Sequence, residues 1–430
     1  MALFRPMLYA IVSQENFKER SMKKAMLFAA ISALFLATNA NAARYIVSYD
    51  ASRADQVRSA IANAGGEIAR QFEIINAVVA ELPDTRGVEK ISKAKGVQAV
   101  EEDKVINWLA DEASTLRASN ELPSLSEILS RIQNSNEEGI TVPVPVVSAE
   151  SSVAEETAVR RSEFPWGITR VNAKGAWNFT EGAGVKVAVV DTGINYNHAD
   201  LKDNYVGGYN AINPSATPMD DQGHGTHVAG TIAAVRNNTG VVGVAPKAKL
   251  YAVKVLGGDG SGSYSSIIAG IEWAVKEKVD VINMSLGGGG YMAAMHDAVK
   301  AAVKANITVV CAAGNDSGPV NYPAKYPEAI AISASNSYDG LAYFSSRGAE
   351  IEFIAPGVDV ESTSMRGGYE KMSGTSMACP HVAGLAALAY GAGHRTPAAV
   401  RKAFQKAASK LPNLTEQQQG YGLIDASLLK

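Results

Sequence analysis

The sequence predicts an α/β fold in which a large parallel-sheet domain follows a small α+β domain. Apolar runs at residues 185–190, 250–255, 279–284 and 307–313 are typical of strands that are buried on both faces. Helical patterns, for example 227–235 and 265–278, alternate with these runs, and that alternation indicates a parallel sheet. We therefore expect reactive side chains at the carboxyl ends of the strands.

The composition excludes several classes of protein. The chain has 430 residues, 47% of them hydrophobic and 19% charged, which is ample material for a core. A formal net charge of −3 argues against a nucleic-acid binder, which usually carries a basic excess. The 2 cysteines, Cys311 and Cys379, cannot make a disulfide framework, and no C-x-x-C pair suggests a zinc or redox centre.

The start of the chain indicates export. From Met22 two lysines precede an apolar stretch and the triplet Ala40-Asn41-Ala42, which is the pattern of a secretory signal. We expect cleavage after Ala42, with 1–42 as the signal and Met22 as a possible true start. An N-terminal membrane anchor is the alternative, but the apolar run is shorter than a spanning helix needs. The product is expected outside the cell or in the periplasm.

Residues 43–110 form the small domain. Strand patterns at 44–49, 72–82 and 97–100 and helical patterns at 55–64 and 88–95 predict two helices against an antiparallel sheet. Residues 111–161 are acidic and lack Phe, Trp and Tyr, which is the composition of a linker. The large domain is predicted to span 162–430.

Three motifs carry candidate chemistry. Asp191-Thr-Gly ends the strand at 185–190, His224-Gly-Thr-His opens a helix, and Gly-Thr-Ser376-Met-Ala opens another. A serine hydroxyl becomes a nucleophile when an imidazole removes its proton and a buried carboxylate holds that imidazole. The chain order Asp, His, Ser is one of the known orders of this triad, and the absent G-x-S-x-G elbow argues against a lipase or esterase.

These motifs, in this order, resemble those of the subtilisin-like serine proteases (subtilases), and the resemblance covers 162–430. It implies that Asp191 orients, that His224 acts as general base and then acid, and that Ser376 attacks the scissile carbonyl. Asn315 falls on the family's oxyanion-hole asparagine. A metal held by His224 and His227 is the alternative, but the glutamate of H-E-x-x-H is absent; His227 and His381 are expected to be packing residues.

The resemblance also implies a peptide-binding cleft in which substrate adds as a strand. Tyr264, Ile267 and Leu286 would line the pocket for the fourth residue before the cut, and a phosphate-binding loop at 257–262 is the alternative. The full set of expected substrate-binding residues is Gly260, Ser261, Gly262, Tyr264, Ile267, Ser285, Leu286, Gly287, Gly314 and Asn321.

A structural calcium ion is implied as well. Hard cations prefer carboxylate, amide and carbonyl oxygens, and the family's ligands fall on Asp200, Val235, Asn237, Thr239 and Val241. The family's glutamine ligand falls on Ser162, which departs from the pattern. A second, weaker site near Ala324, Tyr326 and Glu352 is possible, and a metal-free loop at 237–241 is the alternative.

The small domain resembles the family's inhibitory propeptide, which implies self-cleavage near Leu109-Ala110 and a later trim near Arg160-Arg161. Cys311 and Cys379 are either a disulfide or two free thiols. We expect a secreted, self-processing endopeptidase of broad specificity that is monomeric. Its expected partners are protein and peptide substrates and its own propeptide, with no nucleic acid and no stable membrane anchor. The rival hypotheses are a binding protein with a degenerate protease fold and an acyl transferase that makes peptide bonds.

Overall fold

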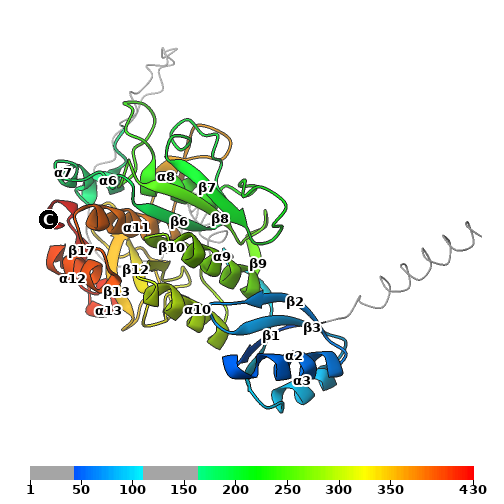
Figure 1. The fold of residues 1–430 in the computed structure, drawn as a ribbon. Coiled ribbons are helices and arrows are strands. Elements are labelled where there is room, and N and C mark those ends of the chain that lie inside the picture. The colour runs from blue at the N-terminus through cyan, green and yellow to red at the C-terminus, as the bar shows by residue number, and fades with distance from the viewer. Residues whose placement is uncertain (1–42, 110–162) are drawn as a thin grey trace, which may run out of the picture. The chain divides into compact units, whose positions relative to one another are not determined.

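A computed structural model describes residues 43–109 and 163–430 of the chain (Figure 1). The predicted signal at 1–42 and the predicted linker at 111–161 lie outside the described residues. The chain folds into two compact units. One comprises 43–72 and Asn76–Asp103, and the other comprises Glu73–Ile75 and, from Lys104 on, the rest of the described chain.

The first unit is an antiparallel sheet with two helices. Its strands are β1 (Ala43–Tyr49), β2 (Glu67–Phe72), β3 (Ala77–Leu82) and β4 (Val97–Glu102), in the order β2-β3-β1-β4. The helices are α2 (Ala54–Asn63) and α3 (Thr85–Ser92), and a short 3-10 turn, η1 (Ala51–Arg53), precedes α2. Val57 and Ile61 of α2 and Ile91 of α3 bury their side chains in the core with strand residues. The predicted α+β fold of this unit is confirmed.

The predicted strand at 72–82 is wrong in its bounds. β2 ends at Phe72, a turn follows in which Asn76 adopts a left-handed φ of 47°, and β3 starts at Ala77. The sequence of β2 gives no alternating signal because β2 is the edge strand and most of its side chains are exposed. The apolar residues 74–75, which follow β2, therefore extended the predicted strand of β3 toward the N-terminus.

The second unit contains a seven-stranded parallel sheet, which confirms the predicted α/β fold. The strand order is β13-β12-β11-β10-β6-β8-β7, and all neighbouring pairs are parallel. The strands are β6 (Lys186–Asp191), β7 (Tyr205–Asn210), β8 (Lys249–Lys254), β10 (Val281–Met284), β11 (Thr308–Ala312), β12 (Ile330–Ser335) and β13 (Ile351–Pro356).

Helices cover both faces of this sheet. Gly270 of α9 (Tyr264–Glu277) lies against Val190 and Val253, on one face. Val187 and Val189 point to the other face, where they share a core with α8 (His224–Ala233) and α11 (Thr375–Gly391). Because successive side chains of a strand alternate between faces, Asp191 points to the face that α8 and α11 cover.

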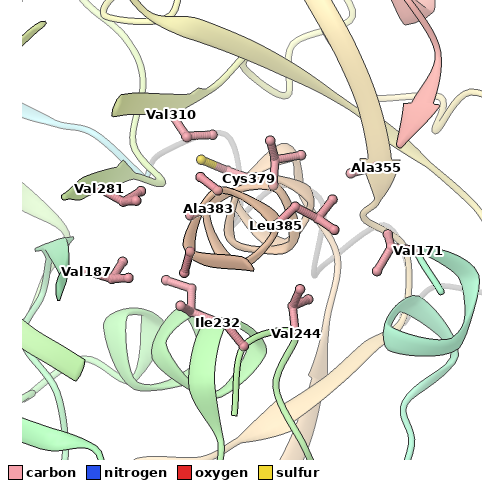
Figure 2. Close-up of a cluster of buried hydrophobic side chains, with 14 of the residues drawn as sticks. Val171, Val187, Ile232, Val244, Val281, Val310, Ala355, Cys379, Ala383 and Leu385 are labelled. Carbon is pink, nitrogen blue, oxygen red and sulfur yellow. The ribbon is translucent and has the colours of Figure 1, made fainter. Parts of the chain in front are cut away.

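The helix α11 is the central element of this core. Figure 2 shows it end-on, with Val187, Val281 and Val310 of the sheet on one side and Ile232 of α8 on another. Every residue from Thr375 to Tyr390 is buried, and a helix that is apolar on all sides is typical of a core position. This burial fixes the helix start, which carries Ser376.

The remaining elements are shorter or peripheral. The helices are α6 (Trp166–Arg170), α7 (Ala173–Ala176), α10 (Ala293–Lys304), α12 (Pro397–Ala407), α13 (Glu416–Gln419) and the 3-10 turn η2 (Ala426–Leu428). The strands are β5 (Val105–Asn107), β9 (Ser261–Ser263), β14 (Val360–Thr363), β15 (Tyr369–Met372), β16 (Ala408–Ser409) and β17 (Leu423–Ile424). Within the described ranges, no helix has the length and apolar character to cross a membrane.

Candidate active site

Asp191 and His224 form a buried pair at the carboxyl end of β6. The Nδ1 of His224 lies 2.8 Å from Oδ1 of Asp191, and both side chains are almost fully buried. The close approach requires Gly225, because a Cβ there would lie 2.1 Å from the carbonyl oxygen of Gly193. With Nδ1 donating to the carboxylate, Nε2 of His224 is left with its lone pair, which is the form that accepts a proton.

Ser376 lies at the same edge of the sheet. Its hydroxyl donates to the carbonyl of Ser285 at 3.3 Å, and the Ser285 hydroxyl donates to the carbonyl of Ser376 at 2.8 Å. That carbonyl is available because its helical partner would be the N–H of residue 380, and Pro380 has none. The Ser285 hydroxyl takes the place of the missing helical donor and so connects the end of β10 to the start of α11.

The sheet register places Asp191 and Ser285, which contact His224 and Ser376, at the same edge of the sheet. Val189 of β6 pairs with Asn283 of β10, so Asp191 is level with Ser285, on a neighbouring strand. Both α8 and α11 therefore start at this edge. A side chain at Gly384 of α11 would meet the Ile232 carbonyl of α8 at 3.3 Å. Gly384 and Ile232 lie equally far along their helices from Ser376 and His224, so the two helices contact each other at corresponding positions.

Burial raises the pKa of Asp191, and His224 together with the hydrogen bond from the Thr192 N–H opposes that rise. Oδ1 accepts both hydrogen bonds, whereas Oδ2 is buried and has no hydrogen-bond partner among the described residues. A buried carboxylate with an unsatisfied oxygen gains most from a positive charge beside it. The pair is therefore suited to hold an imidazolium at His224.

Asn315 lines a small cavity together with Ser376, and Thr375 holds its side-chain amide. Its Oδ1 accepts hydrogen bonds from the N–H of Thr375 at 2.7 Å and from the Thr375 hydroxyl at 2.9 Å. The oxygen is thereby occupied, so Nδ2 is the atom of this amide that has N–H groups to donate, and Asn315 lines the cavity together with Ser376. Thr375, which the sequence did not indicate as functional, thus fixes the orientation of a candidate oxyanion donor.

A segment of the chain lies along this site as a strand. β5 pairs antiparallel with β9, and the N–H of Trp108 then donates to the carbonyl of Gly260 at 3.0 Å. From the other side the N–H of Gly287 donates to the carbonyl of Trp108 at 3.3 Å. Leu109 follows and lines the cavity with Ser376 and Asn315. Residues 104–109 belong to the second unit by their contacts.

The structure brings most of the expected substrate-binding residues to this segment. Ser261 and Gly262 belong to its partner strand β9, Gly260 precedes that strand and accepts from Trp108, and Gly287 and Gly314 lie at the cavity. Gly314 adopts a φ of 113°, and the Asn321 side-chain nitrogen would lie 2.4 Å from a Cβ there, so Asn321 packs against Gly314. Ser285 contacts Ser376 directly.

Tyr264 contacts the strand 105–109. Its ring packs against Trp108, the second residue before the expected cut. Ile106, the fourth residue, approaches Gly289, where a Cβ would meet Ile106 Cδ1 at 3.0 Å. Ile267 and Leu286 are buried, with 0% and 1% of their surface exposed while residues 104–109 lie along the site, and their predicted place in the pocket stays a prediction.

Asp220 and Lys254 hold the loops around the site, and sequence reasoning missed both. Asp220 accepts from the Thr192 hydroxyl at 2.9 Å and from the Thr226 N–H at 2.9 Å, which joins the loop after β6 to the start of α8. An acidic residue just before a helix start was the available signal.

Lys254 is buried, and its Nζ donates to the carbonyls of Thr192 at 2.7 Å and Leu256 at 2.8 Å and to the Asp221 carboxylate at 2.6 Å. All three ammonium protons are thereby used. One side chain thus joins the loop of Asp191, the loop before His224 and the approach to β9. Its sequence context, the end of an apolar strand, gave no such signal.

The two packing histidines are neutral in the folded chain. His227 Nε2 lies 2.9 Å from the Val360 carbonyl, and burial lowers the pKa of His227 to about 3. His381 Nδ1 lies 2.8 Å from the Met377 carbonyl, and burial lowers the pKa of His381 to about 4. The described residues hold no cluster of three or more His, Cys, Asp or Glu side chains, and so the metal alternative at His224 and His227 gains no support.

These histidines predict a loss of stability in acid. The unfolded chain protonates each imidazole near pH 6.5, whereas folded His381 stays neutral to about pH 4, so its contribution is complete above pH 6.5 and is lost as pH falls toward 4. That contribution is about 3 kcal/mol. We expect His381→Gln to lower the slope of unfolding free energy against pH by about 1.4 kcal/mol per unit between pH 4.5 and 6.

Denaturant titrations of the two inhibitor-blocked proteins measure this difference. The comparison is needed because burial raises the pKa of Glu352 to about 7. In both proteins Glu352 therefore contributes to the slope of unfolding free energy against pH with the opposite sign. Equal slopes for His381→Gln and the parent would contradict a neutral buried His381.

Cys311 and Cys379 are both buried and both free, which answers the question that the sequence left open. The Cys379 thiol donates to the Asn283 side-chain oxygen at 3.2 Å. Burial raises the pKa of both thiols, so neither ionises at neutral pH. They act as small apolar side chains behind the site.

The expected calcium ligands gather around one carboxylate. Asp200 is fully buried and accepts from Asn237 Nδ2 at 3.0 Å, the Val241 N–H at 3.2 Å and the Tyr369 hydroxyl at 2.8 Å. No cationic side chain of the described residues pairs with it. The carbonyls of Val235, Thr239 and Val241 accept no hydrogen bond from any described residue. A buried charge without a cation, beside unused carbonyls, fits a hard metal ion.

The second, weaker calcium site does not fit the residues present. The guanidinium of Arg401 donates to the carbonyls of Glu328 and Ala329, each at 2.8 Å, and lies 3.1 Å from the Glu352 carboxylate. The arginine supplies the positive charge that a metal would bring to Glu352. We therefore derive no role for a metal there.

Several known proteins are similar to this chain in sequence. The subtilase family profile matches residues 182–422. Subtilisin amylosacchariticus of Bacillus subtilis subsp. amylosacchariticus is 38% identical over 375 residues, which cover 84% of each chain. M-protease of Shouchella clausii (strain KSM-K16) is 49% identical over 246 residues, 57% of this chain and 64% of that protein. Subtilisin DY of Bacillus licheniformis is 52% identical over 230 residues, 52% of this chain and 83% of that protein.

Proposed function

The chain belongs to the subtilase family, and we propose that it hydrolyses peptide bonds through an acyl-enzyme on Ser376. Family membership makes it a serine endopeptidase of broad specificity that is made as a zymogen. The observation that best supports the site assignment is the strand 105–109, which lies between Gly260 and Gly287 with Leu109 at the cavity of Ser376 and Asn315.

The proposed reaction has two halves. The Ser376 oxygen attacks the substrate carbonyl while His224 Nε2 takes the hydroxyl proton, and Asp191 stabilises the resulting imidazolium. The Asn315 amide and the Ser376 N–H stabilise the oxyanion. The imidazolium then protonates the leaving amine, which breaks the C–N bond and leaves the acyl-enzyme. A water, deprotonated by His224, attacks that ester and restores the Ser376 hydroxyl.

The substrate is proposed to bind as an extended strand in the place of residues 105–109. Backbone hydrogen bonds to Gly260 and Gly287 do not depend on side chains, which suits a protease of broad specificity. Pockets then add preference, and Gly314 with Asn321 forms the wall of the first one.

We propose the following organisation of the precursor. Residues 1–42 are the export signal, 43–110 the propeptide, 111–161 an acidic linker and 162–430 the peptidase domain. The enzyme cuts its own chain near Leu109-Ala110, and residues 104–109 then remain as a product-like inhibitor. A later cut near Arg160-Arg161 removes the linker. The lysine pair, apolar run and Ala-Asn-Ala site at 22–42 support export from the cytosol.

Hydrolysis of casein by the purified protein, with and without phenylmethylsulfonyl fluoride, tests this function. The proposal predicts hydrolysis that the inhibitor abolishes. A degenerate, peptide-binding protease fold would bind casein without cutting it. An acyl transferase would pass the acyl group to an added amine in preference to water. The intact set of Asp191, His224, Ser376 and Asn315 favours the hydrolase.

We also propose that Asp200, Asn237 and the carbonyls of Val235, Thr239 and Val241 hold a structural calcium ion. The ion would neutralise the buried Asp200 carboxylate and tie the loop after α8 to the body of the domain. Glu163 caps the same loop, since its carboxylate accepts from the N–H groups of Asn237 and Asn238 at 3.1 and 2.8 Å. It lies next to Ser162, where the family's glutamine falls.

Removing calcium should lower the melting temperature of the processed, inhibitor-blocked enzyme. Binding at a hundred times the dissociation constant stabilises by about 2.7 kcal/mol, which for a domain of this size is a shift of about 5–10 °C. Calorimetry in calcium and in excess chelator measures it. Asp200→Asn should abolish the difference between the two conditions. An equal melting temperature of the parent in both would contradict the site.

A further inference from the structure

The side chain of Trp108 occupies a site of its own beside β9. Only 2% of the Trp108 surface is exposed. Its indole N–H donates to the carbonyl of Gly262 at 2.9 Å. Its ring meets the Tyr264 ring edge-on, with the centroids 5.0 Å apart and the planes at 80°. One residue thus makes a backbone strand contact, a side-chain hydrogen bond and an aromatic contact.

The walls of this site are built by the peptidase part of the chain. A Cβ at Gly262 would lie 2.5 Å from the Val255 carbonyl oxygen, so β9 is pressed closely onto the end of β8. The Gly257 N–H donates to the Ser261 carbonyl at 2.8 Å, which fixes the loop before β9. The Gly262 carbonyl is thereby held in a defined direction, toward the indole.

The Tyr264 ring is fixed as well. Ser263 caps α9, since its hydroxyl accepts from the Ser266 N–H at 3.0 Å. The Tyr264 hydroxyl accepts from the Gly290 N–H at 3.2 Å on the far side of the cleft. Because the ring and the carbonyl are already fixed, little conformational entropy is lost when a ligand binds to them. The hydrogen bonds of Ser263, of the Tyr264 hydroxyl and of Gly257 join residues of the peptidase part to one another and do not involve residues 104–109.

We propose that the processed enzyme has a subsite selective for tryptophan at the second residue before the scissile bond, formed by the Gly262 carbonyl and the Tyr264 ring. This inference rests on the proposed function, because it takes residues 105–109 to mimic a bound substrate. Tryptophan fits better than phenylalanine because only the indole brings a ring N–H to Gly262 O. Edge-on aromatic contact and burial of the large ring add to that hydrogen bond.

A series of p-nitroanilides, Ile-Asn-X-Leu, tests the subsite while all other positions keep the chain's own residues 106, 107 and 109. X is Trp, 1-methyltryptophan, Phe or Ala, and kcat/KM is measured with the processed enzyme. We expect Trp to exceed Ala by at least about tenfold. Methylation of the ring nitrogen removes the donor and keeps the ring, so it should lower kcat/KM by about 2- to 10-fold.

Variants separate the aromatic wall from general effects. Tyr264→Ala should reduce the ratio of Trp to Ala substrates toward one, whatever it does to the absolute rates. Tyr338→Ala removes a tyrosine that is 92% exposed and should leave the ratio unchanged.

The outcomes are distinct. Hydrolysis of all four peptides at similar rates would overturn the subsite and leave the protease assignment intact. A Trp preference that survives both methylation and Tyr264→Ala would also overturn it. Failure to cut any peptide or casein would instead contradict the proposed function.

Discussion

Ser376→Ala is expected to leave the precursor uncut and to abolish casein hydrolysis. The hydroxyl that would form the acyl-enzyme is absent, while the side chain at the start of α11 changes by one atom. In subtilisin itself, loss of the catalytic serine costs about 2 × 10⁶ in kcat, and we expect a loss of similar size. N-terminal sequencing of the protein made by cell-free synthesis, together with the casein assay, measures both effects.

Ser215→Ala is the matched control. Ser215 is exposed, does not line the cavity of Ser376, and its hydroxyl donates to Asn213. This variant should be processed and active like the parent. Processing near Leu109 in purified Ser376→Ala, in the absence of other proteases, would show that the cut is not made through Ser376.

Asp191→Asn is expected to lower kcat by about 10⁴ with little change in KM. Asp191 lies behind His224 and does not border the cavity of Leu109, so peptide binding should survive. An asparagine keeps the shape of the side chain but removes the negative charge that stabilises the imidazolium. It can also donate to Nδ1, which favours the tautomer in which Nε2 carries the proton and cannot accept one.

Steady-state kinetics on Ile-Asn-Trp-Leu p-nitroanilide measure kcat and KM separately. Asp203→Asn is the control, because Asp203 is exposed on the surface of the same unit. A fall in kcat of less than tenfold for Asp191→Asn would mean that this carboxylate does not support the imidazole during the reaction.

The sequence predicted the fold where local pattern and tertiary environment agree. β6, β8, β10 and β11 were found because strands buried on both faces consist of unbroken apolar residues. β2 was missed because an exposed edge strand has neither an apolar run nor clear alternation. In the small unit, the turn at Asn76 lies between two strands and has no glycine or proline to announce it.

The site divides in the same way. Asp191, His224, Ser376 and Asn315 stand in short motifs, so their types and order were readable. Thr375 and Lys254 act through partners far away in the chain, such as Asn315 and Thr192, and only folding brings these together. The state of Cys311 and Cys379 and the pairing of Arg401 with Glu352 also depend on such distant contacts.

The convergence of Ser376 and His224 is tested most directly by labelling with phenylmethylsulfonyl fluoride and locating the adduct by peptide mass spectrometry. The account predicts one sulfonyl group per processed chain, on the Ser376 oxygen, and its loss in His224→Ala, because the hydroxyl is then no longer activated. An adduct on another residue, or equal labelling of Ser376 in His224→Ala, would contradict the account.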